Sequence, residues 1–190
     1  MSRVVITSLL YFLTMNILAL DQSRSGGYAI FDYETKQLIT YGSFSFPNEK
    51  YSYPKAIFKI KRLVDKLIKQ YDVQACFIEE IALKMNVVAF KRLAQLQGVL
   101  ENYFIEHYML YDIIQPTVWQ NYAGARKRTS KEIQNKTVEL NTKGKKETKI
   151  LSIKFIHDVY GIDTSNDGIA DAIGIGHYVV NNIKIEVNKE

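Results

Sequence analysis

The chain has 190 residues, of which 47% are apolar and 24% are charged, and its formal net charge is +5. This length and composition are typical of one folded globular domain, which we take to span residues 1–190. The only cysteine, Cys76, excludes an intrachain disulfide, and one cysteine with three scattered histidines cannot form a standard structural zinc site.

The positive charge is concentrated in one segment. Residues 126–149 hold nine Lys or Arg and three Glu, a net charge of +6, so the rest of the chain has a net charge of −1. A local excess of this kind favours a polyanionic partner. The alternative explanation of this charge excess is a solvated loop.

The first 20 residues have one early Arg and are otherwise mostly apolar, which resembles a signal peptide. No small-x-small cleavage motif follows, however, and the segment leads directly into Asp21, as a buried strand would. We therefore expect residues 1–14 to be an N-terminal extension of a cytoplasmic protein that has no membrane partner. Export or membrane anchoring is the alternative.

Hydrophobic periodicity and turn residues predict five strands, the first three forming an antiparallel meander. The expected strands are residues 16–21, 28–34, 38–46 and 73–81, and a fifth lies in the run of residues 110–119 and ends at Pro116.

Four helices are expected between and after these strands. They run from Pro54 to about Tyr71, over residues 86–104, over residues 148–161 and from about Asp167 onward. Gly98 lies inside the second of these helices, where glycine is unfavourable and often indicates a close backbone approach. This order of elements predicts a mixed α/β domain with one central sheet.

Acidic side chains lie at the ends of three of these elements, namely two strands and one helix. Asp21 ends the first strand, Glu79 and Glu80 end the fourth, and Asp167 and Asp171 begin the last helix. Residues four apart share one face of a helix. If the first and fourth strands are neighbours, all of these acids converge at one end of the sheet.

Several carboxylates buried together cannot all stay ionised without cations. Oxygen ligands favour Mg²⁺ or Mn²⁺, and a pair of such ions is suited to phosphodiester hydrolysis. Taken singly, each acid is explained more simply as a turn former, a solvated strand end or a helix cap. Their shared location favours the metal site.

Four segments in this order resemble the RuvC-type Holliday-junction resolvases of the ribonuclease-H-like superfamily, particularly the phage-encoded branch. The segments are "ILALDQSRSGGYAIF", "FIEEIALKMN", "KGKKETKILSIKFIHDVYG" and "DGIADAIGIGHY". The resemblance extends over about residues 15–185. It implies a ribonuclease-H-like α/β fold with a central mixed five-stranded sheet, in which an antiparallel three-stranded meander is joined by parallel strands and flanked by helices.

The resemblance also implies the site residues. The family's metal-binding and catalytic carboxylates correspond to Asp21, Glu79, Asp167 and Asp171, with Glu80 as the alternative for the fourth strand. They would hold Mg²⁺ (or Mn²⁺), two ions per active site. The family's lysine close to the scissile phosphate corresponds to Lys146, together with Lys145.

The resemblance implies a homodimer that resolves four-way DNA junctions by paired nicks. The helix of residues 86–104 would pack against its twin across the two-fold axis, through Leu93, Leu96, Gly98 and Leu100, for which ordinary core packing is the alternative. Residues 124–143 resemble a basic insertion. The expected contacts to the DNA backbone are Arg126, Arg128, Lys131, Lys145 and Lys146.

The resemblance leaves the substrate partly open. Ala82 stands where bacterial members often have an aromatic residue near the junction centre, so other branched DNA, such as forks, is a further possible substrate. Two alternative functions are a different ribonuclease-H-like nuclease, acting on RNA–DNA hybrids or RNA, and a non-catalytic junction-binding protein. We expect four aromatic residues to pack within the protein, with stacking on unpaired bases as the alternative: Tyr51, Tyr53, Trp119 and Tyr122.

Overall fold

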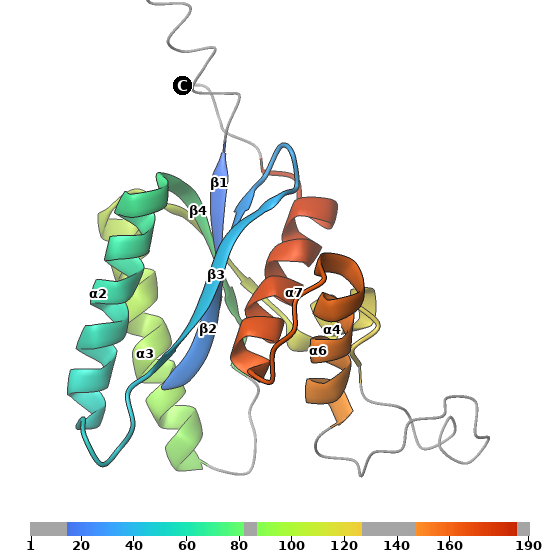
Figure 1. Cartoon of the computed structure of the whole chain (residues 1–190). Coiled ribbons are helices and arrows are strands. Elements are labelled where there is room, and N and C mark those ends of the chain that lie inside the picture. Colours follow the sequence, from blue (N-terminus) through green and yellow to red (C-terminus); the bar gives the residue numbers. More distant parts are fainter. Residues whose placement is uncertain (1–14, 82–86, 127–146, 186–190) are drawn as a thin grey trace, which may run out of the picture.

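The computed structural model describes residues 15–81, 87–126 and 147–185, and Figure 1 shows a central sheet with helices on both faces. Five strands form the sheet in the spatial order β3-β2-β1-β4-β5. Their bounds are β1 Asn16–Asp21, β2 Ser25–Asp32, β3 Leu38–Ser45, β4 Val73–Glu79 and β5 Leu110–Ile114. The first three strands pair antiparallel, whereas β1–β4 and β4–β5 pair parallel. The predicted mixed five-stranded sheet is therefore confirmed.

Helices cover the two faces of the sheet separately (Figure 1). On one face lie α2 (Tyr53–Tyr71) and α3 (Val87–Glu106). The other face carries α4 (Pro116–Tyr122), α6 (Glu147–Tyr160) and α7 (Asp167–Asn182). No helix within the described ranges is long and apolar enough to cross a membrane.

The core is divided by the sheet because successive side chains of a strand point to opposite faces. In β1, Ile17 and Ala19 belong to the apolar cluster on the α7 face, whereas Leu18 and Leu20 belong to the cluster on the α2–α3 face. Continuing this alternation places Asp21 on the α7 face.

The fifth strand is shorter than expected. It ends at Ile114, two residues before the expected end at Pro116, and Pro116 begins α4, a helix that was not predicted from the sequence. Proline is compatible with the first helical turn because its missing N–H would have no intrahelical partner there. Trp119 is consequently on a helix that folds over the end of the sheet.

Two of the leucines expected at a dimer interface belong instead to the core of their own chain. Leu96 and Leu100 are fully buried on the α2–α3 face of the sheet. A Cβ built on Gly98 would meet no atom within 4 Å, so Gly98 makes no close backbone approach within this chain. The expectation is therefore wrong for the two leucines, and Gly98 faces open space.

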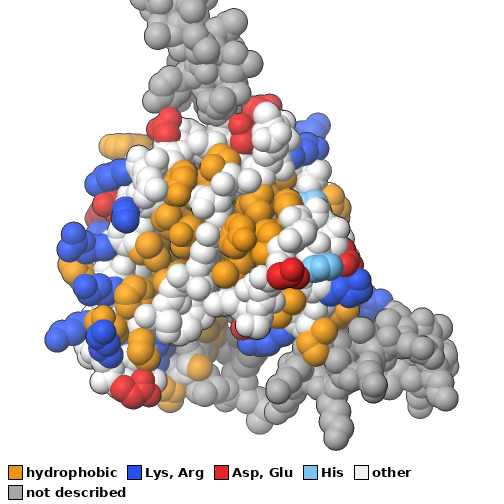
Figure 2. Space-filling model, in the orientation of Figure 1, with side chains coloured by type: hydrophobic (Ala, Val, Ile, Leu, Met, Phe, Trp, Pro, Cys, Tyr) orange, Lys and Arg blue, Asp and Glu red, His pale blue; other side chains and the backbone are white. Residues whose placement is uncertain are grey.

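Positive charge is also found outside the segment of residues 126–149. Figure 2 shows Lys and Arg side chains along the side of the molecule formed by α2. This helix carries six basic residues and one acidic residue: Lys55, Lys59, Lys61, Arg62, Asp65, Lys66 and Lys69. On the same view, apolar side chains gather across the middle of the molecule.

Candidate active site

Two of the predicted acids are brought together by the register of the sheet. Asp21 is the last residue of β1 and Glu79 the last residue of β4, and these neighbouring strands are parallel, with Leu20 opposite Ile78. The carboxyl ends of both strands therefore meet at one edge of the sheet.

A close contact between α7 and β2 adds the helix to this edge. The helix begins at Asp167, and the side chain of Asn166 caps it by accepting a hydrogen bond from the Ile169 N–H at 3.2 Å. Gly168 touches the backbone of Gly27, where a Cβ would lie 2.0 Å from the Gly168 carbonyl oxygen. Since Gly27 pairs with Asp21 in the β1–β2 ladder, this contact places the first turns of α7 beside the end of β1.

Electrostatic coupling shows that Asp21, Glu79 and Asp171 are close neighbours. Burial raises the pKa of Asp21 well above its ordinary value, and the charges of Glu79 and Asp171 raise it further, while Lys149 opposes the rise. Burial also raises the pKa of Asp171 to about 7. The Ser152 hydroxyl, which can donate to this carboxylate, lowers the pKa of Asp171, Glu79 raises it and Lys149 lowers it. Burial therefore disfavours the ionised form of both aspartates unless a cation stabilises their charge.

Asp167 lies at the rim of this group. Its carboxylate is 39% exposed and forms an ion pair with the Lys149 ammonium group of α6. Lys149 thus acts on all three aspartates, since it also lowers the pKa of Asp21 and of Asp171.

The donor atoms fit a hard divalent ion, although the described side chains do not form a complete cage. Within residues 15–81, 87–126 and 147–185, no three His, Cys, Asp or Glu side chains are already gathered as ligands of one ion. Mg²⁺ does not require such a cage, because it is commonly held by one or two carboxylates, water and substrate phosphates. Buried carboxylates with raised pKa values are compatible with this mode of binding.

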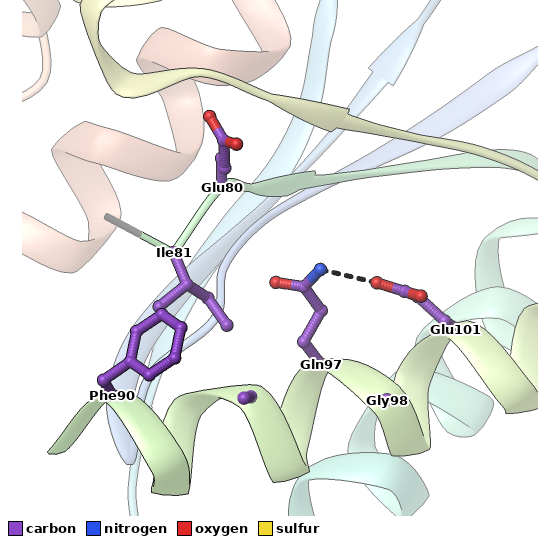
Figure 3. A pocket seen from close by; sticks show the side chains of 7 residues that line it. Glu80, Ile81, Phe90, Gln97, Gly98 and Glu101 are labelled. Atoms are coloured by element: carbon purple, nitrogen blue, oxygen red, sulfur yellow. Dashed lines mark hydrogen bonds between the residues drawn. The ribbon is translucent and has the colours of Figure 1, made fainter. Parts of the chain in front are cut away.

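Glu79 and Glu80 differ in their surroundings. Glu79 raises the pKa of both aspartates, and its carboxylate accepts a hydrogen bond from the Trp119 indole at 3.0 Å. Glu80 is exposed and borders a pocket of about 340 Å³ between the end of β4 and α3. In Figure 3 its side chain points away from Gln97 and Glu101 of α3. The geometry therefore favours Glu79 over Glu80 as the acid of this strand.

Gln22 supports the site from the α3 side. It is one of two buried polar residues in the described part of the chain, and its side-chain amide donates to the Glu79 carbonyl at 2.7 Å and to Gln97 at 3.0 Å. Gln97 in turn donates to Glu101 (Figure 3). This chain of hydrogen bonds connects the end of β4 to α3.

Sequence reasoning overlooked four residues of this site, namely Gln22, Trp119, Lys149 and Ser152. Lys149 lies within the basic segment, and one signal was available: Lys149, Ser152 and Ile156 recur at helical spacing. Ser152 and Ile156 are both fully buried, which identifies the inward face of α6.

Several predicted residues lie outside the described ranges, and their expected roles remain predictions. They are residues 1–14, Ala82, Arg128, Lys131, Lys145, Lys146 and all of the proposed insertion after Arg126. Arg126 itself is described and exposed, shortly after the end of α4.

The aromatic residues mostly contact other parts of the protein. Trp119 is fully buried, which confirms packing and excludes base stacking for this residue. Tyr51 packs edge-on against Phe46, and the Tyr53 hydroxyl donates to the Arg92 carbonyl. Tyr122 packs against Tyr178 and remains 46% exposed.

Solved structures with the same fold include complexes of RuvC and of a viral resolvase with Holliday junctions, although their sequences are distant. The structure of Thermus thermophilus RuvC in complex with a Holliday junction has 11% identity and a TM-score of 0.62, and the match covers 88% of this chain and 96% of that one. The fowlpox virus resolvase, also in complex with a Holliday junction, has 16% identity and a TM-score of 0.55, with 89% and 99% covered. No curated protein sequence matches the chain.

The family is shown by a sequence model rather than by these distant structures. The model described as "Crossover junction endodeoxyribonuclease RuvC" matches residues 17–175, a range that includes Asp21, Glu79 and Asp171. The chain therefore belongs to the RuvC family of crossover junction endodeoxyribonucleases and is an endonuclease.

Proposed function

We propose that this endonuclease resolves Holliday junctions by metal-dependent, paired hydrolysis of phosphodiester bonds. The observation that carries the proposal is the mutual coupling of Asp21, Glu79 and Asp171 at one edge of the sheet in a chain of the RuvC family. Two solved structures of the same fold, the Thermus thermophilus and fowlpox virus proteins, are complexes with Holliday junctions.

Four carboxylates hold Mg²⁺ or Mn²⁺ in this proposal: Asp21, Glu79, Asp167 and Asp171. Two bound ions would activate the attacking water and stabilise negative charge on the scissile phosphate. Burial of Asp21 and Asp171 keeps bulk water away from these carboxylates and strengthens their interaction with a cation.

Lys149 supplies positive charge from the protein itself. Its ammonium group lies at Asp167 and acts on Asp21 and Asp171, so a phosphate that approaches these acids also approaches Lys149. Lys146, which the family resemblance places near the scissile phosphate, is three residues earlier in the sequence. We assign both lysines to phosphate binding, with Arg126, Arg128, Lys131 and Lys145 as further contacts to the DNA backbone.

The proposed dimer uses a revised face of α3. Since Leu96 and Leu100 face inward, the residues available to a second copy are those at helical spacing on the opposite side. Val87 and Ile105 are 57% and 61% exposed, so both apolar side chains are available for contact with a partner. The proposed interface is a stripe of Val87, Phe90, Ala94, Gly98 and Ile105, with the partner copy as its occupant.

The finer assignments belong to the same proposal. They are a source in the phage-encoded branch, action in the host cytoplasm, and cleavage of forks or other branched DNA besides four-way junctions. None of them affects the chemistry at the acids.

The test compares synthetic substrates. The purified full chain is incubated with a four-way junction, a Y-fork, linear duplex and an RNA–DNA hybrid, each with Mg²⁺, Mn²⁺ or EDTA. Paired symmetric nicks on the junction that disappear in EDTA are the expected result. Equal cutting of fork and junction would indicate a general branch nuclease, and preferential cutting of the hybrid would replace the proposed substrate. Tight junction binding without cutting would indicate a binding protein.

A further inference from the structure

We propose that Trp119 is a positioning residue of the acidic site, whose indole N–H holds the Glu79 carboxylate in the orientation that binds a divalent ion. The inference rests on the proposed function only in taking Glu79 as a metal ligand. It adds a residue that neither the acidic pattern nor the family resemblance indicated.

The contact is direct and buried. Trp119 Nε1 donates to Glu79 Oε1 at 3.0 Å, and the indole is fully buried in the cluster between the sheet and α7. A hydrogen bond to an ionised carboxylate is stronger than one between neutral groups. Because a carboxylate can accept about four hydrogen bonds or metal contacts, engaging Oε1 leaves capacity for a cation.

The fold brings Trp119 to Glu79 through the last two strands. Glu79 lies opposite Ile114 at the end of β5, and the Ile114 carbonyl accepts a hydrogen bond from the Glu80 N–H at 2.9 Å. Pro116 then begins α4, and Trp119 follows within its first turn. The short connection between Ile114 and Trp119 therefore fixes the indole above the end of β4.

A glycine on α7 makes room for the ring. A Cβ on Gly174 would lie 2.6 Å from Trp119 Cζ3, so the indole occupies space that any larger residue would fill. Gly174 is one helical turn after Asp171. The same indole thus contacts the helix that carries Asp171 and the strand that carries Glu79, and it fixes the two relative to each other.

Residues that orient a metal ligand typically alter metal affinity or activity by about 10–100-fold when removed. We therefore expect Trp119→Phe, which keeps an aromatic ring and removes the N–H, to weaken Mg²⁺ or Mn²⁺ binding by about 10–100-fold in calorimetric titrations. The half-saturating metal concentration for junction cleavage should rise by a similar factor. Cleavage at saturating metal should recover most of the wild-type kcat.

A matched control separates positioning from packing. Val179→Ala also removes atoms from a fully buried side chain of the same cluster, but this residue lies two turns beyond Asp171. A purely structural role for Trp119 would lower the Tm of Trp119→Phe, as it lowers that of Val179→Ala, and leave metal affinity at the wild-type value. That result would overturn the proposal.

A second measurement needs no substitution at Trp119. Because the chain has one tryptophan, its fluorescence reports on this site alone. Titration with Mn²⁺, a paramagnetic quencher, should give saturable quenching that is lost in Glu79→Gln, whereas an unchanged spectrum would contradict the proposed contact. If the wild-type chain binds ions and quenches but cuts no nucleic acid, the proposed function fails and this inference stands. If it binds no divalent ion, the inference fails.

Discussion

Gly27 and Gly168 bring the backbones of β2 and α7 into contact, since a Cβ on Gly27 would lie 2.0 Å from the Gly168 carbonyl oxygen. Gly27 is the β-ladder partner of Asp21, and Gly168 follows Asp167 in the first turn of α7. This one contact therefore determines how far the aspartates of the helix lie from the aspartate of the strand.

Gly27→Ala should separate these elements. The added methyl group meets backbone atoms that cannot rotate away, so we expect the free energy of unfolding to fall by about 1–3 kcal/mol. At a temperature where the variant remains folded, metal-dependent cleavage should also be reduced, so that the loss of activity exceeds what unfolding alone would cause. Thermal unfolding by circular dichroism and a junction assay test this expectation. Ser43→Ala, at the exposed residue paired with Gly27 on β3, is the control and should change neither quantity appreciably.

The strands and the acids were predictable because their signals are local. Asp21 and Glu79 each follow a short apolar run, and parallel pairing of β1 with β4 is sufficient to bring them together. Trp119 was not predictable in the same way. An apolar run through Pro116 has the same appearance whether it continues a strand or begins a helix, and only the helix folds the indole back toward Glu79.

Two further differences between the sequence-based predictions and the structure have a common physical origin. Leu96 and Leu100 follow the same helical periodicity as an interface would, so sequence alone cannot tell which partner buries them. The ion pair of Lys149 with Asp167 depends on how α6 packs against α7, which no spacing within either helix specifies. Packing between elements decided both outcomes.

Glu79→Gln and Glu80→Gln form a matched pair of adjacent substitutions. Glu79 is coupled to both buried aspartates, whereas Glu80 is exposed beside the pocket at α3. We expect Glu79→Gln to reduce junction cleavage by at least about 100-fold, as loss of a metal ligand would. Glu80→Gln should retain activity within a few-fold of wild type. The reverse result would move the ligand role to Glu80.

Asp171→Asn should abolish cleavage while junction binding is retained or improved, because the substitution removes a negative charge that repels phosphate. Gel-shift and cleavage assays on one four-way junction measure both properties. Asp163→Asn removes an equal charge from a side chain that is 91% exposed, and it should leave cleavage intact. Loss of binding together with cleavage in Asp171→Asn would contradict the assigned role.

The same substitution should change how stability depends on pH. The folded, metal-free protein holds the Asp171 proton up to a pKa of about 7, whereas an unfolded aspartate loses it near pH 4. The stability that this proton contributes is complete below about pH 4 and is lost as the pH rises toward 7. In EDTA, the difference between the Tm of Asp171→Asn and the Tm of wild type should therefore increase between pH 5 and pH 8. The increase should be about 2–4 °C for each kcal/mol of unfolding free energy that wild type loses. A pH-independent difference in Tm would exclude this titration.

Gly98→Arg tests the revised dimer face. Nothing lies within 4 Å of a Cβ at this position, so the side chain can be accommodated in a folded monomer. It would introduce a charge at the centre of the proposed interface, and we expect sedimentation to show monomers where wild type forms dimers. Ala89→Arg adds the same charge at an exposed position nine residues from Gly98, on the opposite side of α3, and it should leave the dimer intact. A dimer that survives Gly98→Arg would place the interface elsewhere.

Lys149→Met should shift the acid side of the pH–rate profile toward higher pH. The ammonium group lowers the pKa of Asp21 and of Asp171, so its removal raises both pKa values, and the carboxylates then ionise at a higher pH. An opposite charge within about 4–6 Å lowers a carboxyl pKa by about one unit or more, and we expect a shift of up to about one unit here. Lys154→Met is the control because this lysine lies on the same helix but pairs with the exposed Asp158. A loss of rate that is equal at every pH would mean that Lys149 contacts the phosphate without tuning the acids.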